Sequence, residues 1–241
     1  MPTQVPVRSR LGVVALATSA LLFAAFPLVR PFFQLDVFVF SPALAAVASG
    51  PLDSPPWVVA HLVLTAAFAL LPVGLLAIQA ALADTAAGPR ARRGTALAMA
   101  GLGLVLPAVG VETFAMPVLG RLYLDGVTGV APALAWIYRG PMTLVMLGGL
   151  LLLAGGAIDL ARGVWRSAGL PRWSGVAFAS GLALWLPVLP RPVRIVDGLL
   201  IGLGGLWLAW GLWRAGSGPA TDGAVAPSAA AAERAVPHRA L

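Results

Sequence analysis

Six long apolar segments, each almost free of charge, dominate this chain. Each is close to the roughly 20 residues that a helix needs to cross the hydrocarbon core of a bilayer. We place them at about residues 11–29, 57–82, 95–116, 142–160, 175–189 and 195–213. The pattern predicts an all-α protein, an integral membrane bundle of six transmembrane helices.

Composition supports a membrane class and one domain. Of the 241 residues, 59% are hydrophobic and only 10% are charged, whereas about a quarter of the residues are charged in soluble proteins. The spans and their turns occupy most of the chain. We therefore predict a membrane domain at 11–213, a short cytoplasmic N-terminus at 1–10 and a disordered cytoplasmic tail at 214–241. The tail is rich in Ala, Gly, Ser and Pro, and such a composition cannot offset the entropy of ordering.

Arginines at the span ends predict the orientation. With the N-terminus inside, nine of them fall on the cytoplasmic side and five on the other side, and such an excess on short loops sets topology. The nine are Arg8, Arg10, Arg90, Arg92, Arg93, Arg162, Arg166, Arg172 and Arg214, and the five are Arg30, Arg121, Arg139, Arg191 and Arg194. Both termini are predicted to be cytoplasmic (N-in/C-in), and the compartment is the inner membrane of a bacterium. The net charge of +7 then reports topology, and we expect the bilayer rather than nucleic acid as partner.

Two features of the outer side leave alternatives open. Ala43 to Ala45 resembles a signal-peptide cleavage site, but the first span is longer than the roughly 7–15 residues of a signal core. Whether that span is retained or cleaved stays open. The outer segments 31–56 and 118–138 carry large apolar side chains, so we expect them to lie in the membrane interface. There they either form a lid or extend the neighbouring helices.

Very few polar groups lie inside the spans, and intramembrane ionisable groups are costly enough to be candidate functional sites. His61 and Glu112 have similar depths in two antiparallel neighbouring spans, and Thr65 and Gln79 share a helix face with His61. One hypothesis is a proton or ligand site. Burial favours the neutral form of a carboxylic acid, whereas a nearby positive charge favours the charged form, and the balance of the two lets such a pair exchange a proton. The alternative, which the sequence favours, is a structural hydrogen bond between helices.

Other chemistry finds little support in the sequence. Haem ligation by two imidazoles needs a second histidine, and His238 lies in the predicted tail. There is no cysteine, and no phosphate-binding loop, zinc motif or nucleophile elbow is recognisable, so we expect no catalytic residues, metal or cofactor. The i,i+3 spacing of Asp159 with Arg162 and of Asp197 with Arg194 predicts two surface ion pairs.

Small residues and prolines predict packing and bends. Gly198, Gly202 and Gly205 lie on one face of the last span, which favours close contact with another helix. That helix belongs either to the same chain or to a membrane partner such as a second copy. The pattern G-L-x-L-x-L-P occurs at 101–107 and again at 181–187, which is consistent with a duplicated helical hairpin. Its prolines are expected to bend their helices.

The combination of His61, the basic loop at 90–93, VETFAMP at 111–117 and GLPRW at 169–173 resembles small polytopic membrane proteins of GC-rich bacteria. No activity is assigned to that group, so the resemblance implies topology alone. We expect a non-enzymatic accessory or small-ligand-binding protein of the inner membrane. The alternative is a proton-coupled carrier of a small solute that uses the His61 and Glu112 pair.

Overall fold

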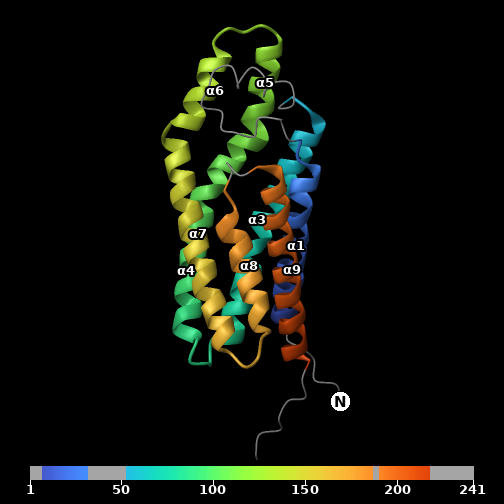
Figure 1. The fold of residues 1–241 in the computed structure, drawn as a ribbon, viewed down its shortest axis with the longest axis vertical. Helices are drawn as coiled ribbons and strands as arrows, with labels where there is room; N and C mark the ends of the chain where they lie inside the picture. Colours follow the sequence, from blue (N-terminus) through green and yellow to red (C-terminus); the bar gives the residue numbers. More distant parts are fainter. Residues whose placement is uncertain (1–6, 32–52, 187–189, 218–241) are drawn as a thin grey trace, which may run out of the picture.

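The computed structural model describes residues 7–31, 53–186 and 190–217. All regular elements in these residues are helical, which confirms the predicted all-α class (Figure 1). The elements are α1 (Val7–Val29), α3 (Pro55–Leu82), α4 (Gly88–Gly110), the π-helical turn η1 (Val111–Ala115), α5 (Met116–Leu124), α6 (Val130–Arg139), α7 (Pro141–Arg166), α8 (Arg172–Leu184) and α9 (Arg191–Gly216).

Five helical stretches in the described residues are long and apolar enough to cross a membrane. They are Arg10–Val29, Pro55–Leu82, Gly88–Leu124, Pro132–Arg166 and Arg191–Gly216. The segment expected to be the fifth of six spans is the short helix α8, with 13 residues. At 1.5 Å per residue α8 is about 20 Å long, which is less than the roughly 30 Å of a hydrocarbon core.

Helix α8 ends shortly before a proline. The chain leaves the helix at Trp185, and Pro187 itself lies outside the described residues. The helical conformation is disfavoured for a residue that precedes proline, but Leu71 and Leu106 precede prolines inside α3 and α4 and stay helical. The two G-L-x-L-x-L-P segments thus differ although their sequences match, because residues 101–107 lie wholly inside α4.

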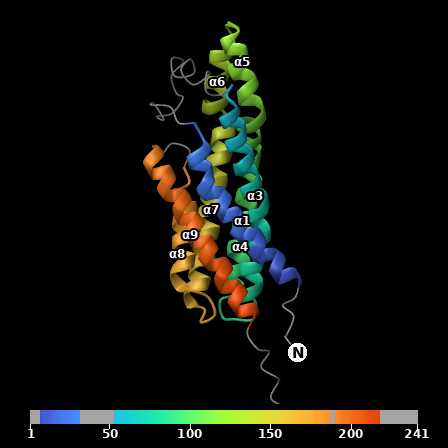
Figure 2. The same ribbon diagram turned by 90° about the vertical axis from the view of Figure 1, so that its right-hand side faces the viewer.

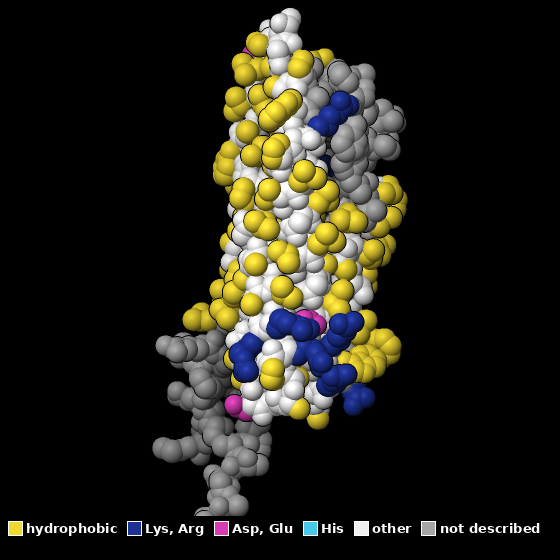
Figure 3. Space-filling view, turned by 90° about the vertical axis from the view of Figure 1, so that its left-hand side faces the viewer, with side chains coloured by type: hydrophobic (Ala, Val, Ile, Leu, Met, Phe, Trp, Pro, Cys, Tyr) yellow, Lys and Arg dark blue, Asp and Glu magenta, His cyan; other side chains and the backbone are white. Residues whose placement is uncertain are grey.

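The helices form an elongated bundle in which α4 packs on α7, α1 packs on both α3 and α9, and α8 lies between α7 and α9 (Figures 1 and 2). The start of α1 and the end of α9 lie at the same end of the bundle, together with the turns α3–α4 and α7–α8 (Figure 1). Arginine side chains gather near this end (Figure 3), which we call the basic end.

Glycines bring α4 and α7 into backbone contact. A Cβ atom on Gly101 would lie 2.5 Å from the carbonyl oxygen of Gly149, and one on Gly156 would lie 2.5 Å from the carbonyl oxygen of Gly94. Any side chain at these positions would overlap the neighbouring backbone. Small residues allow such close approach in membranes, where van der Waals packing drives helix association.

The glycine face predicted on the last span lies against α1 of the same chain. A Cβ atom would lie 2.9 Å from Pro27 Cγ at Gly198, 2.9 Å from Ala24 Cβ at Gly202 and 2.6 Å from Ala20 Cβ at Gly205. The three glycines are buried within the chain.

An ion pair ties α4 to α7 near the basic end. Asp159 is buried and its Oδ2 accepts a hydrogen bond from Arg93 Nε at 2.7 Å, while its predicted partner Arg162 is 3.8 Å away. The predicted pair is therefore present, but its carboxylate is buried rather than at the surface, and the closer partner comes from the neighbouring helix. Spacing along one helix could not reveal that second partner.

The outer segment 118–138 extends the long helices. Helix α5 continues α4 through η1, and α6 leads into α7, so both rise above the ends of α1, α8 and α9 (Figures 1 and 2). The stretch Gly88–Leu124 has 37 residues and would be about 55 Å long if straight, which exceeds the roughly 40–45 Å of a whole bilayer. Most of the other outer segment, 31–56, and most of the predicted tail lie outside the described residues.

Candidate functional site

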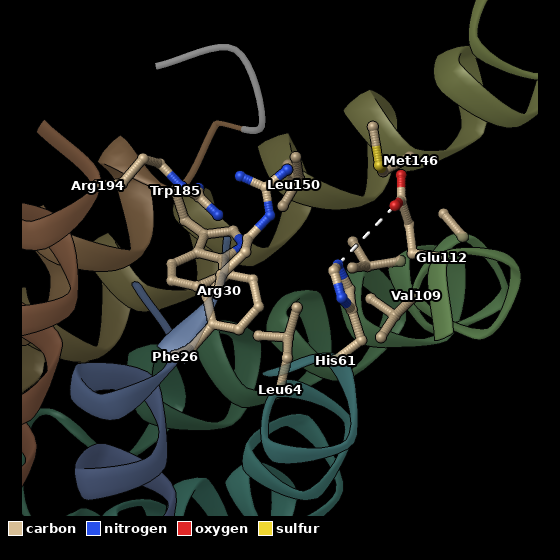
Figure 4. Close-up of a pocket in the computed structure, with 12 residues that line it drawn as sticks. Phe26, Arg30, His61, Leu64, Val109, Glu112, Met146, Leu150, Trp185 and Arg194 are labelled. Atoms are coloured by element: carbon tan, nitrogen blue, oxygen red, sulfur yellow. Dashed lines mark ion pairs between the residues drawn. The ribbon is translucent and has the colours of Figure 1, made fainter. Parts of the chain in front are cut away.

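The structure brings His61 and Glu112 together at the upper part of the bundle. His61 lies in the second turn of α3 and Glu112 lies in η1, and the distance from His61 Nε2 to Glu112 Oε2 is 3.8 Å. The two side chains point toward one another (Figure 4). Their similar depth in antiparallel helices is what the sequence led us to expect.

The position of Glu112 depends on the wide turn η1. In this turn the N–H of Met116 donates to the carbonyl of Val111, five residues earlier. The next residue is Pro117, which has no N–H group. The Glu112 carbonyl is thus left without its usual helical donor, and Trp57 Nε1 on α3 donates to it at 2.9 Å. Such π-helical turns occur frequently at functional sites.

The Glu112 carboxylate has one bonded and one unbonded oxygen. Tyr138, at the end of α6, donates its hydroxyl proton to Glu112 Oε1 at 2.7 Å. Glu112 Oε2, the oxygen that faces His61, is buried and has no hydrogen-bond partner among the described residues. Buried polar atoms are nearly always bonded, so an orphan of this kind marks a place where a ligand, water or proton can be accepted.

Hydrogen bonding defines which histidine nitrogen faces the acid. His61 Nδ1 is 2.8 Å from the carbonyl of Trp57, which can only accept, so Nδ1 carries the hydrogen. Nε2 then faces Glu112 Oε2. If both atoms presented only lone pairs, they would repel each other. A favourable contact therefore requires one shared proton, carried by the imidazole or by the acid. At 3.8 Å, one water or a small rotation would complete the link.

A cavity of about 70 Å³ adjoins the pair. It is large enough for a few waters or one small ion, since a single water needs roughly 10–15 Å³ by this measure. The lining side chains come from the ends of α1, α8 and α9 and from α3, α4, η1 and α7. Besides His61 and Glu112, the ionisable groups that line it are Arg30 and Arg194. Figure 4 shows both arginines on the side of His61 that is away from Glu112.

Arg194 stabilises the C-terminal end of α8. Its Nη1 donates to the carbonyl of Leu186 at 3.2 Å, and its guanidinium stacks over Trp185 at 4.1 Å from the ring centroid. Irregular backbone at membrane depth needs such internal partners, because lipid offers none. The residue after the end of α8, Trp185, thus lies in the cavity wall, and Arg194, which binds this end of the chain, lies in the same wall.

The second partner of Arg194 corrects the prediction of a surface ion pair. Asp197 Oδ2 lies 3.8 Å from Arg194 Nη1, but Arg194 is only 5% exposed and Asp197 is fully buried at 0%. Neither Asp197 oxygen has a hydrogen-bond partner among the described residues. The i,i+3 spacing identified the pair but not its surroundings, because the same spacing occurs on buried and exposed helix faces.

Aromatic side chains close the cavity toward the bundle centre. Trp185 packs against Phe23 and Phe26, with ring centroids 5.2 and 5.5 Å apart, and Phe26 meets the edge of the His61 ring at 5.6 Å. Arg30, just past the end of α1, lies over Trp57 at 5.1 Å from the ring centroid. The charged groups therefore sit in an apolar surround of low dielectric, where electrostatic interactions are stronger than in water.

The other two predicted site residues lie elsewhere. Thr65 donates to the carbonyl of His61 at 2.8 Å and its hydroxyl is 3.4 Å from that of Thr113, so it lies one turn away from the cavity. Gln79 is eighteen residues from His61, or about 27 Å along α3, near the basic end. The sequence analysis did not select Trp57 or Tyr138, and it assigned Arg194 to a surface ion pair with Asp197. Only their depth near the outer boundary hinted at the site.

The described residues thus define an all-helical protein with five helices long and apolar enough to cross a membrane, in which a His–Glu pair and two arginines share one cavity. Within those residues, no group of three or more His, Cys, Asp or Glu side chains gathers as it would around a metal ion. No protein family, curated protein or solved structure was found to match the chain.

Proposed function

We propose that this chain is a non-enzymatic, multi-pass protein of the bacterial inner membrane that binds a small anionic ligand in the cavity beside His61 and Glu112. The observation that carries the proposal is the cavity itself, which has two guanidinium groups and one carboxylate in its wall. Its volume of about 70 Å³ admits only a small ion or molecule. Arginine is well suited to hold such a group because its planar donors match anionic oxygens.

The proposed topology has six passes with both ends in the cytoplasm. Both described ends of the chain lie at the basic end of the bundle (Figures 1 and 3), as an even number of passes requires. The positive-inside rule assigns that end to the cytoplasm. In this arrangement α8 forms the helical part of the fifth pass, and the cavity lies toward the periplasm.

The binding proposal is tested with nitrate as the probe and thermal unfolding of the detergent-purified protein as the readout. We expect nitrate to raise the melting temperature, because a ligand that binds only the folded state stabilises it. Arg30→Gln should weaken nitrate binding about tenfold or more, the value of a charge-assisted hydrogen bond. Arg139→Gln is the matched control, since Arg139 is exposed and does not line the cavity. A melting temperature that nitrate does not change would refute the proposal, as would equal responses of the two variants.

A second candidate function is a proton-coupled carrier of the same small anion. One observation favours it specifically: Glu112 Oε2, which has no hydrogen-bond partner among the described residues, faces His61 Nε2, and both residues line the cavity.

Uptake into proteoliposomes separates the carrier from a structural pair. We expect an inward proton gradient to drive nitrate uptake by the wild type, and Glu112→Gln to reduce uptake to the level of protein-free liposomes. Glutamine keeps the shape and the acceptor for Tyr138 but cannot carry the proton. The carrier function requires that this variant and His61→Ala keep the wild-type melting temperature. If they chiefly lose stability, or if uptake survives in Glu112→Gln, the pair is a structural bridge between helices.

A further inference from the structure

A groove of about 320 Å³ lies between α7 and α8, well away from the cavity beside His61. The residues that matter here are Ile158, Arg162 and Trp165 on α7 and Val176, Ala179 and Ala183 on α8. We call this hollow the α7/α8 groove. Its walls are apolar except for Arg162 and the hydroxyl of Ser180.

The groove has a charged mouth and an apolar interior. Helix α7 runs toward the basic end, so Arg162 and Trp165 lie nearer that end than Ile158 does. On α8 the groove extends over the eight residues from Val176 to Ala183, a rise of about 10 Å along the axis. A hollow of this kind at membrane depth faces lipid chains rather than water.

The charges at the mouth favour an anion. Asp159 is the carboxylate beside Arg162, but its Oδ2 already accepts from Arg93 at 2.7 Å, and Arg162 lies 3.8 Å from Oδ1. Two guanidinium groups thus share one carboxylate, and the side chain of Arg162 remains 68% exposed. Other arginines gather at the same end of the molecule (Figure 3). Basic pockets between transmembrane helices are typical sites for the headgroups of anionic lipids.

Two tryptophans mark the depth of a headgroup. Trp165 at the mouth and Trp173 at the start of α8 form an edge-to-face pair with ring centroids 5.0 Å apart, and both are exposed. Tryptophan prefers the boundary between the hydrocarbon and the headgroups. Arg162 and Trp165 therefore lie where the phosphate and glycerol of a lipid would be, and Ile158 and Ala183 lie where its chain would be.

We propose that the α7/α8 groove binds an anionic phospholipid, with the phosphate on Arg162 and one acyl chain along Ile158, Ala179 and Ala183. A helix from a second copy is a poorer occupant. A helix is about 10–12 Å across, as wide as the roughly 10 Å that the groove covers along α8, whereas a single acyl chain is much thinner. The site does not depend on the function proposed for the cavity, since the two share no residue.

Native mass spectrometry of the full chain in detergent, with phosphatidylglycerol or phosphatidylcholine added, tests the site. We expect phosphatidylglycerol to be retained preferentially, and Arg162→Gln to weaken its binding about five-fold, the effect of one arginine near an anionic headgroup. Arg172→Gln, an exposed arginine at the same end that does not line the groove, should leave binding unchanged. Ala183→Phe fills the interior and should reduce the retention of both lipids.

Two results would overturn the lipid site. One is equal retention of phosphatidylglycerol by the wild type, Arg162→Gln and Ala183→Phe. The other is a dimer that Ala183→Phe dissociates, which would assign the groove to a second copy of the chain. The melting temperature of each variant without lipid shows that the variant is folded, so a loss of retention can be assigned to the groove.

Discussion

Gly156→Val should lower the free energy of unfolding by about 3 kcal/mol, the upper end of the usual cost of overpacking. The Cβ atom alone would lie 2.5 Å from the backbone nitrogen of Ala98 and 2.5 Å from the carbonyl oxygen of Gly94. Both are backbone atoms of α4, so no rotamer change can relieve the overlap and the two helices must separate. Unfolding by sodium dodecyl sulfate in mixed micelles measures the change.

Gly155→Val is the matched control for this prediction. Gly155 is the adjacent residue of the same helix, and a Cβ atom there would meet nothing within 4 Å. Helix propensity and hydrophobicity change identically in the two variants, so their difference isolates the contact between α4 and α7. If both variants unfold like the wild type, the close approach of these two helices is wrong.

Arg194→Met should lower the free energy of unfolding by about 3–5 kcal/mol, the usual cost of leaving one partner of a buried ion pair alone. The variant removes the donor to the Leu186 carbonyl and the guanidinium that lies 3.8 Å from the fully buried Asp197. Methionine keeps an unbranched apolar stem in place of the aliphatic part of arginine, so the packing along that stem is largely retained. The same micelle titration provides the measurement.

The double variant Arg194→Met with Asp197→Leu should recover much of that loss. An apolar pair of similar volume is often as stable as the buried ion pair it replaces, because neither group then needs solvation. Arg191→Gln, three residues earlier on an exposed part of α9, should change stability by less than about 1 kcal/mol. A double variant no more stable than Arg194→Met would show that the lost bond to Leu186, rather than Asp197, dominates.

Hydropathy and helical phase predicted the all-helical class and the meeting of His61 with Glu112, because depth and antiparallel neighbours follow from the order of the spans. They did not predict the length of α8. The expected span at 175–189 corresponds to a helix that ends at Leu184, whereas the prolines inside α3 and α4 do not end those helices. A hydropathy window does not detect this end, since the residues around it are as apolar as those of a full span.

The rest of the site depends on contacts between residues that are far apart in the sequence, which the local sequence pattern does not predict. Tyr138 reaches Glu112 from α6, 26 residues later, only because α5 and α6 fold back as a hairpin above the bundle. The wide turn at η1 follows from Pro117 together with a tertiary donor, Trp57, and the proline alone does not predict it. Helix α7 also contains two Gly-Gly pairs, Gly148–Gly149 and Gly155–Gly156. Only Gly149 and Gly156 face α4, and the packing rather than the sequence shows which member of each pair does so.

The backbone contact between α4 and α7 has a consequence for movement in this molecule. These two helices are joined by glycines along their length and by Arg93 and Asp159 near one end, so they form a rigid frame. The cavity lies between this frame, α3 and the ends of α1, α8 and α9. Rigid packed units shift as whole bodies while neighbouring elements rotate about them. Any route from the cavity to the outside would therefore open by displacement of α1, α8 and α9, with the frame as the stationary part.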